Sequence, residues 1–291
     1  MKPKQNKILV PLNFSEQSLI ALEQTYRLAS YSGAEIIVLY VNKLSSGIWS
    51  IFSKDEQNSF TEKVKIKLLR LEEDLSKNKN ISLRPIIKKG KVHEEILKLA
   101  KEESVDLIVM GTRDSKNIKE KIIGNTTFKI VREAKCPVVS IKGKHHRNVC
   151  DHIILPLDLS KETREKVSYA IKFGRLFKST IHAVSVITTK NPVQIRKLNS
   201  QLQQVVKFIQ QTGLKCTAEL LEVKNENDKI ANALIAHANR KKGDMIIIMT
   251  QQENEIMEYF VGSTASEIIF HSDIPIMSIV PTFKHYYKVV I

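Results

Sequence analysis

Two loops in the chain combine glycine with small polar residues directly before a predicted helix. The first contains Gly124-Asn125-Thr126 and the second contains Gly262-Ser263-Thr264. The first turn of a helix presents backbone amides without intrahelical partners and carries the positive end of the helix dipole, so it suits phosphate and other anions. Each loop also follows an apolar run, 107–110 or 245–248, of the kind found in buried parallel strands. The spacing therefore predicts two anion-binding corners, each between a strand and a helix.

A polar residue follows the first predicted strand in each half of the chain. Asn13 stands in Pro11-Leu-Asn-Phe-Ser15, and Asp158 stands in Pro156-Leu-Asp-Leu-Ser160. Ligands of open parallel sheets bind beyond the carboxyl ends of the strands, where the strand order reverses, so these residues are expected near the two corners. The alternative is structural: the glycines make tight turns and the polar residue caps the first helix.

These features occur twice because the chain is a tandem repeat. Residues 7–15 return as 152–160 at an offset of 145, and residues 106–110 return as 244–248 at an offset of 138. The change of offset places a net deletion of seven residues between the first and fourth strands of the second copy. Two copies predict two cores, which suits a length of 291 residues.

Each copy alternates short apolar runs with segments of helical periodicity. Strands separated by helices require crossover connections, so the prediction is an α/β fold with two tandem doubly wound, Rossmann-like parallel sheets. The predicted strands are 7–12, 36–41, 82–87, 107–110 and 137–141 in the first copy, and 153–156, 181–186, 215–221, 245–248 and 275–280 in the second. The helices predicted in the first copy begin after Ser15 and continue to Gly33, then cover 54–77, 92–104 and 125–133.

The predicted domains are 1–143 and 151–291, joined by a basic linker at 144–150. The last ten residues of the second domain, 282–291, end in the apolar run Tyr286-Tyr-Lys-Val-Val-Ile291. An apolar tail of this kind is expected to add a strand to a sheet edge, within the chain or on a partner.

Composition narrows the classes of function. The chain has 46 basic and 31 acidic residues, but its lysines are interleaved with glutamates along helices, so nucleic-acid binding is not favoured. No apolar run approaches the roughly 20 residues of a membrane span, and the amino end does not resemble a signal peptide. Three cysteines without a CxxC pattern fit a reducing compartment, and a cytoplasmic location is predicted. No catalytic motif is present, so an enzymatic role beyond slow ATP hydrolysis is not favoured.

The strand-one Pro-x-Asn/Asp-x-Ser, the glycine loops and the closing Cys136-Pro-Val-Val together resemble the universal stress protein family, as a tandem pair along nearly the whole chain. The resemblance implies an adenine nucleotide alpha hydrolase-like fold and a stress-response regulatory role. It also implies ATP, ADP or AMP with Mg²⁺ as ligand, and a pseudo-dimer of the two halves through closing strands 137–141 and 275–280.

Nucleotide-binding members carry Gly-x2-Gly-x9-Gly-Ser/Thr in the loop and an aspartate after the first strand, and each copy departs from this pattern. Asn13 and Asp114 replace the aspartate and the second glycine in copy one, whereas Met249 and Gln252 replace the first two glycines in copy two. The resemblance implies these cofactor-binding positions: Pro11, Asn13, Val41, Met110, Gly111, Arg113, Asp114, Gly124, Asn125, Thr126, Pro156, Asp158, Val186, Ile248, Gly262, Ser263 and Thr264.

Two other interpretations follow from the departures. The pockets could be closed, leaving an interaction scaffold that binds no nucleotide. The deletion in copy two could instead leave a larger apolar crevice that carries a small apolar ligand. A homodimer of the whole chain is compatible with all three interpretations.

Overall fold

The computed structural model describes residues 5–42, 53–76, 81–112, 125–143, 150–158, 163–223, 230–250 and 261–281. The chain divides into two compact units. Unit 1 comprises Met1–Cys150 with the short segment Ser272–Ile276, and unit 2 comprises Asp151–His271 with Met277–Ile291. The predicted tail at 282–291 and most of the predicted linker lie outside the described residues.

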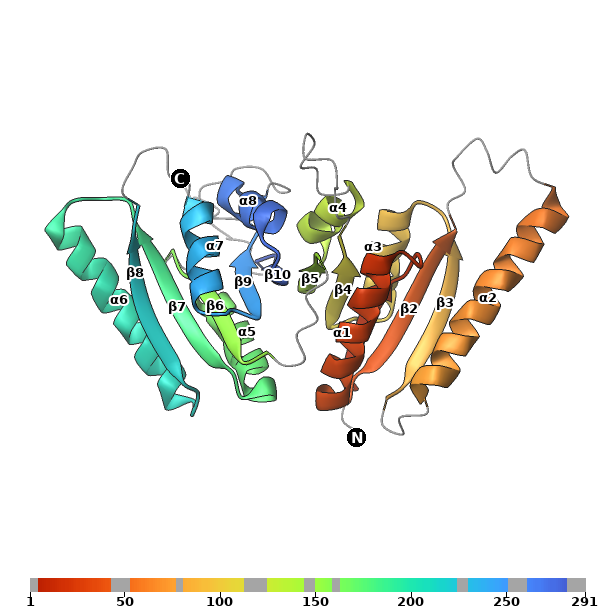
Figure 1. The fold of residues 1–291 in the computed structure, drawn as a ribbon, viewed down its shortest axis with the longest axis horizontal. Coiled ribbons are helices and arrows are strands. Elements are labelled where there is room, and N and C mark those ends of the chain that lie inside the picture. The colour runs from red at the N-terminus through yellow and green to blue at the C-terminus, as the bar shows by residue number, and fades with distance from the viewer. Residues whose placement is uncertain are drawn as a thin grey trace, which may run out of the picture. The chain divides into compact units, whose positions relative to one another are not determined.

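The first repeat forms a parallel sheet in the order β3-β2-β1-β4-β5 (Figure 1). The chain moves outward from β1 to β3, then returns to the other side of β1 with β4, so the strand order reverses between β1 and β4. Its elements are β1 (Lys7–Pro11), α1 (Glu16–Ser32), β2 (Glu35–Asn42), α2 (Lys54–Ser76), β3 (Leu83–Lys89), α3 (Val92–Glu102), β4 (Leu107–Gly111), α4 (Asn125–Glu133) and β5 (Val138–Ile141).

The second repeat has the same order, β8-β7-β6-β9-β10, and reverses between β6 and β9. The two tandem α/β domains predicted from the sequence are therefore confirmed. The elements are β6 (His152–Pro156), α5 (Thr163–Phe177), β7 (Thr180–Ile187), α6 (Pro192–Gln211), β8 (Cys216–Glu222), α7 (Ile230–Arg240), β9 (Met245–Met249), α8 (Ser263–His271) and β10 (Ile276–Ile279).

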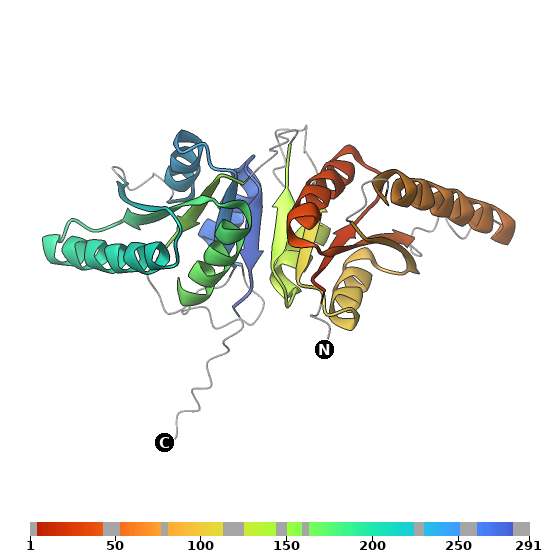
Figure 2. The ribbon, with the colours of Figure 1, turned by 90° about the horizontal axis from the view of Figure 1, so that it is seen from below.

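Helices cover both faces of each sheet (Figure 2), which explains why the strands lack polar alternation. Leu9, Ile37 and Ile108 in unit 1, like Ile154 and Ile246 in unit 2, are fully buried. Among the described residues, no helix is long and apolar enough to cross a membrane.

Local signals place the helix ends. Ser15 caps α1 by accepting a hydrogen bond from the Ser18 amide at 3.3 Å, and Gly33 ends the helix in the left-handed conformation at φ 65°. The deletion in the second copy is largely a shorter connection: residues 43–53 separate β2 from α2, whereas 188–191 separate β7 from α6.

The two units differ at the amino-terminal ends of their first strands. Unit 1 has an ion-pair network there: Glu103 accepts from Lys7 at 2.6 Å and from Arg84 at 2.9 Å, and Arg84 also pairs with Glu35 at 2.8 Å. The hydrogen bond from Arg84 has the largest effect on the pKa of Glu103, followed by the hydrogen bond from Lys7. Together they lower this pKa to about 2.

Unit 2 has histidines at this edge. Nδ1 of His152 lies 3.0 Å from Nε2 of His182, and Nδ1 of His182 lies 2.8 Å from the Thr217 hydroxyl. Burial, followed by the nearby charge of His152, lowers the pKa of His182 to about 4. The corresponding edges of the two units therefore differ in their titratable groups: ion pairs of Glu103 in one, and in the other a histidine, His182, whose lowered pKa keeps it neutral near neutral pH.

Candidate ligand sites at the carboxyl edges of the sheets

The predicted residues of the first copy lie at the carboxyl ends of adjacent strands. Pro11 ends β1, Val41 is near the end of β2, and Met110 and Gly111 end β4. The Leu12 amide continues the pairing by donating to the Leu39 carbonyl at 2.8 Å. Since β1 and β4 are neighbours where the strand order reverses, this edge is the crevice position of a doubly wound sheet.

Gly111 is required by the packing of α1. A Cβ at this position would lie 2.2 Å from the carbonyl oxygen of Gln17 and 2.9 Å from the amide nitrogen of Ser18. Both are backbone atoms, which cannot turn aside as the end of a flexible side chain can. The glycine therefore lets the first turn of α1 lie directly on the end of β4, which is a structural reason for a residue predicted from a ligand-binding motif.

Asn13 takes part in the entry to α1. Its side-chain oxygen accepts a hydrogen bond from the Ser15 amide at 3.0 Å, and its side chain is otherwise exposed. The next residue, Phe14, has a positive φ of 59°, and its ring lies 5.8 Å from that of Tyr40 and 5.4 Å from the Lys67 ammonium group. The aromatic contact and the Asn13 bond together fix the turn between β1 and α1.

Several predicted positions of copy one lie outside the described residues. These are Arg113, Asp114 and Gly124, in the connection from β4 to α4. On either side of that connection, Thr112 donates from both its amide and its hydroxyl to the Ile141 carbonyl, at 2.8 and 3.2 Å. Asn125 begins α4, and Thr126 in its first turn is half-buried. The connection therefore starts from an anchored strand end and leads into the amino end of a helix.

In unit 2 the strand-one aspartate lies beside a buried lysine. Lys166 of α5 is 5 % exposed, and its Nζ donates to the Pro156 carbonyl at 3.0 Å. The same Nζ lies 3.8 Å from Oδ1 of Asp158, whose side chain is 34 % exposed. The ammonium group thus balances the carboxylate at the carboxyl end of β6.

Sequence reasoning missed Lys166. Its counterpart in the first copy, 145 residues earlier, is Ala21, which is fully buried. Asn13 with Ala21 is a neutral pair, and Asp158 with Lys166 is an opposite-charge pair. A side-by-side comparison of the two copies would have shown that the lysine appears together with the aspartate.

Met249 changes how the helix lies on the sheet in unit 2. It takes the position of Gly111 and is 6 % exposed. Because it carries a side chain, the backbone of α5 cannot approach the end of β9 as the backbone of α1 approaches β4. Ile248, Pro156 and Val186 lie at the ends of β9, β6 and β7, and the first two are buried.

The connection from β9 to α8 is closed at its base. Thr250 donates to the Ile279 carbonyl at 3.0 Å, as Thr112 donates to Ile141, and the Gly262 amide donates to the Thr250 carbonyl at 2.9 Å. Gly262 is buried. In the first turn of α8, Ser263 is exposed and Thr264 is half-buried. The Gly262 amide is already bonded, so among the described residues an anion at this corner would meet the amides of the first turn of α8.

Comparison with known proteins supports the family suggested by the motifs. The model of the universal stress protein family matches residues 5–142 and matches again at residues 150–279. This chain belongs to the universal stress protein family. Two matches in one chain agree with the tandem sheets, each with its own carboxyl edge.

The similar proteins include universal stress proteins of about half this length. One from Methanocaldococcus jannaschii is 30 % identical over 162 residues, which is 50 % of this chain and 99 % of that protein. One from Bacillus subtilis is 30 % identical over 146 residues, 47 % of this chain and 99 % of that protein.

Solved structures resemble the whole chain. A universal stress protein from Archaeoglobus fulgidus has a TM-score of 0.75 at 20 % identity and covers 94 % of this chain and 96 % of its own, which shows a shared fold. Another structure from that organism, a universal stress protein in complex with dAMP, has a TM-score of 0.37 at 18 % identity over 44 % of this chain and 95 % of its own.

Proposed function

We propose that the chain is a stress-response regulatory protein that binds an adenine nucleotide at the carboxyl edge of at least one sheet. One observation carries the proposal: α4 and α8 begin at equivalent positions, each beyond the strand next to the reversal of strand order. The first turn of a helix has amides without intrahelical partners, and the carboxyl edge is where doubly wound sheets bind ligands. Binding there would order the adjoining connection and change a surface that a partner reads.

The two edges offer different groups to the same ligand. Asp158 provides a carboxylate that accepts hydrogen bonds from ribose hydroxyls, and Ser263 and Thr264 provide hydroxyls beside the amides of α8. In unit 1, Thr126 has the equivalent place in α4, while the Asn13 oxygen already accepts from Ser15. Among the described residues no three metal-ligating side chains gather, so Mg²⁺ would be held mainly by the phosphates of the nucleotide.

A second candidate is an interaction scaffold whose corners bind no nucleotide. The buried Met249 and the pairing of Asp158 with Lys166 favour it, since both use site positions for internal contacts. A cytoplasmic location, a homodimer and the pairing of the closing strands stay predictions under either candidate.

Isothermal titration calorimetry separates the two candidates. Mg-ATP, ADP, AMP and dAMP are titrated into the full chain and into Asp158→Ala; dAMP is included because one family member was solved with it. The proposal expects saturable binding of at least one nucleotide by the wild-type chain. Absence of heat with all four at millimolar concentration contradicts it and leaves the scaffold.

A further inference from the structure

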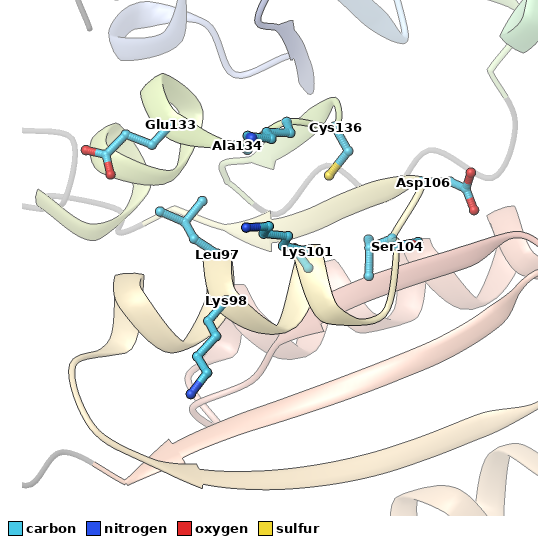
Figure 3. Close-up of a pocket in the computed structure, with 11 residues that line it drawn as sticks. Leu97, Lys98, Lys101, Ser104, Asp106, Glu133, Ala134 and Cys136 are labelled. Atoms are coloured by element: carbon cyan, nitrogen blue, oxygen red, sulfur yellow. The ribbon is translucent and has the colours of Figure 1, made fainter.

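A cavity of about 680 Å³ lies in unit 1 at the edge opposite the candidate nucleotide site. It is formed where α3 and α4 end and where β4 and β5 begin, and its lining includes Leu97, Lys101, Ala134 and Cys136 (Figure 3). Its volume falls within the roughly 300–1,000 Å³ of small-molecule sites. Because it lies at the amino ends of the strands, it is separate from the corners described above.

The wall of this cavity is apolar, with lysines around it. Figure 3 shows the Leu97 side chain, the Lys101 side chain and the Cys136 sulfur directed into the space between α3 and the Ala134–Cys136 segment. Burial, and next the charge of Asp106, raise the pKa of the Cys136 thiol to about 12. The thiol is therefore protonated near neutral pH and acts as an apolar lining group.

The acidic and basic side chains around the cavity differ in whether they have partners within the protein. Both carboxylates of the lining have partners: Asp106 accepts from the Lys7 amide at 2.9 Å, and Glu133 pairs with Arg132. Lys98, Lys101 and Lys135 are exposed, and none of their ammonium groups has an ion-pair or hydrogen-bond partner within the described ranges. The backbone amide of Lys7 is neutral, so Asp106 keeps its negative charge, and among the described residues the lining carries three lysines against this one carboxylate without an ion pair.

The second copy lacks this set of lysines. The residues 138 positions after Lys98, Lys101 and Lys135 are Ala236, Asn239 and Asp273. A lysine near a helix end is also stabilised by the helix dipole, but this general effect does not require three lysines among the lining residues of one copy, when the corresponding positions of the other copy hold one, Lys242 at the position of Ser104.

We propose that this cavity binds a small organic anion with an apolar body, such as an aromatic or short-chain acid, with its anionic group on Lys101. The apolar body lies against Leu97 and Ala134, and Lys135 attracts the anion from the rim, whereas the Lys98 side chain extends from the opposite side of α3 (Figure 3). Such a ligand uses both features of the site, because its apolar body covers the apolar part of the wall and its anionic group lies beside the exposed ammonium group of Lys101.

Protection of Cys136 from a thiol reagent tests the proposal on the full chain. Naphthalene-2-sulfonate is the anionic probe, 2-naphthalenemethanol is its neutral analogue, and methyl methanethiosulfonate at pH 8 is the reagent, with labelling of each cysteine followed by mass spectrometry. Cys150 and Cys216 are each 7 % exposed and serve as internal references. Alanine-methyl NMR of Ala100 and Ala134 gives a second readout that does not depend on thiol reactivity.

The expected result is saturable protection of Cys136 by the sulfonate, together with methyl shifts. Lys101→Ala should raise the half-protecting concentration about tenfold, and high salt should also raise it. Lys172→Ala removes an equal charge from the exposed surface of α5 and should leave the concentration unchanged. Equal protection by the neutral analogue, no effect of Lys101→Ala, or absence of both protection and methyl shifts would each overturn the proposal.

Discussion

The ammonium group of Lys166 lies 3.8 Å from the carboxylate of Asp158 and donates to the carbonyl at the end of β6. In the first copy the corresponding residues are Ala21 and Asn13, so both members of the pair are neutral. Charge at this corner is therefore balanced in both units, by different residues. A phosphate approaching either corner meets no uncompensated carboxylate from the first strand.

Lys166→Ala alone should destabilise unit 2. It removes the ammonium group that lies 3.8 Å from the Asp158 carboxylate and the donor to the Pro156 carbonyl, a loss of about 2 kcal/mol. The free energy of unfolding, measured by chemical denaturation and followed by a probe in unit 2, checks the value.

The double variant Asp158→Asn/Lys166→Ala provides the matched control, because it installs the pair found in the first copy. It should recover most of the lost free energy, which a double-mutant cycle reports as coupling between the sites. Additive losses in the two single variants would show that the two residues do not compensate each other.

Gly111→Ala should destabilise unit 1 by about 3 kcal/mol, because the added methyl group meets backbone atoms of Gln17 and Ser18. The comparison variant is Gly213→Ala. Gly213 has a positive φ of 85° and nothing within 4 Å of an added Cβ, so it reports backbone strain alone, about 1 kcal/mol. Thermal unfolding of both variants gives the comparison, and equal losses would mean that α1 does not constrain Gly111.

Much of the fold could be predicted because its signals are local. Apolar runs marked the strands, Ser15 and Gly33 marked the ends of α1, and repeated motifs marked the copies. The reason for Gly111 could not be predicted, since it depends on how closely α1 lies on β4. Lys166 was missed for a similar reason: a lysine within an amphipathic helix looks solvent-exposed until the helix is placed against β6.

Acid should affect unit 2 before unit 1. The neutral His182 of the folded state, with its pKa near 4, binds a proton less readily than a histidine of the unfolded chain, with a pKa near 6.5. The stability linked to His182 is therefore complete above about pH 6.5 and is lost as the pH falls toward 4. The charged and titratable groups around it are His152, His237, Lys241 and Glu219.

Hydrogen exchange of β7 and β8 between pH 7 and 4.5, corrected for intrinsic rates, measures this loss. His182→Gln should flatten the pH dependence in unit 2. Glu103 of unit 1 serves as the reference. Because its pKa is lowered in the folded state, the stability linked to Glu103 is complete above about pH 4.5 and is lost as the pH falls toward 2. Simultaneous loss of protection in both units at pH 5 would contradict the assignment to His182.

Counting nucleotides on the intact chain tests the ligand proposal most directly. Native mass spectrometry with Mg-ATP compares the wild type with Thr126→Glu/Thr264→Glu, which places a carboxylate in the first turns of α4 and α8. A carboxylate there favours the helix dipole, so folding is retained, but it repels phosphate. We expect one or two nucleotides on the wild type, none on the glutamate variant, and wild-type binding by Thr126→Gln/Thr264→Gln. Equal occupancy of the wild type and the glutamate variant, or no nucleotide on the wild type, would contradict binding at the amino ends of these helices.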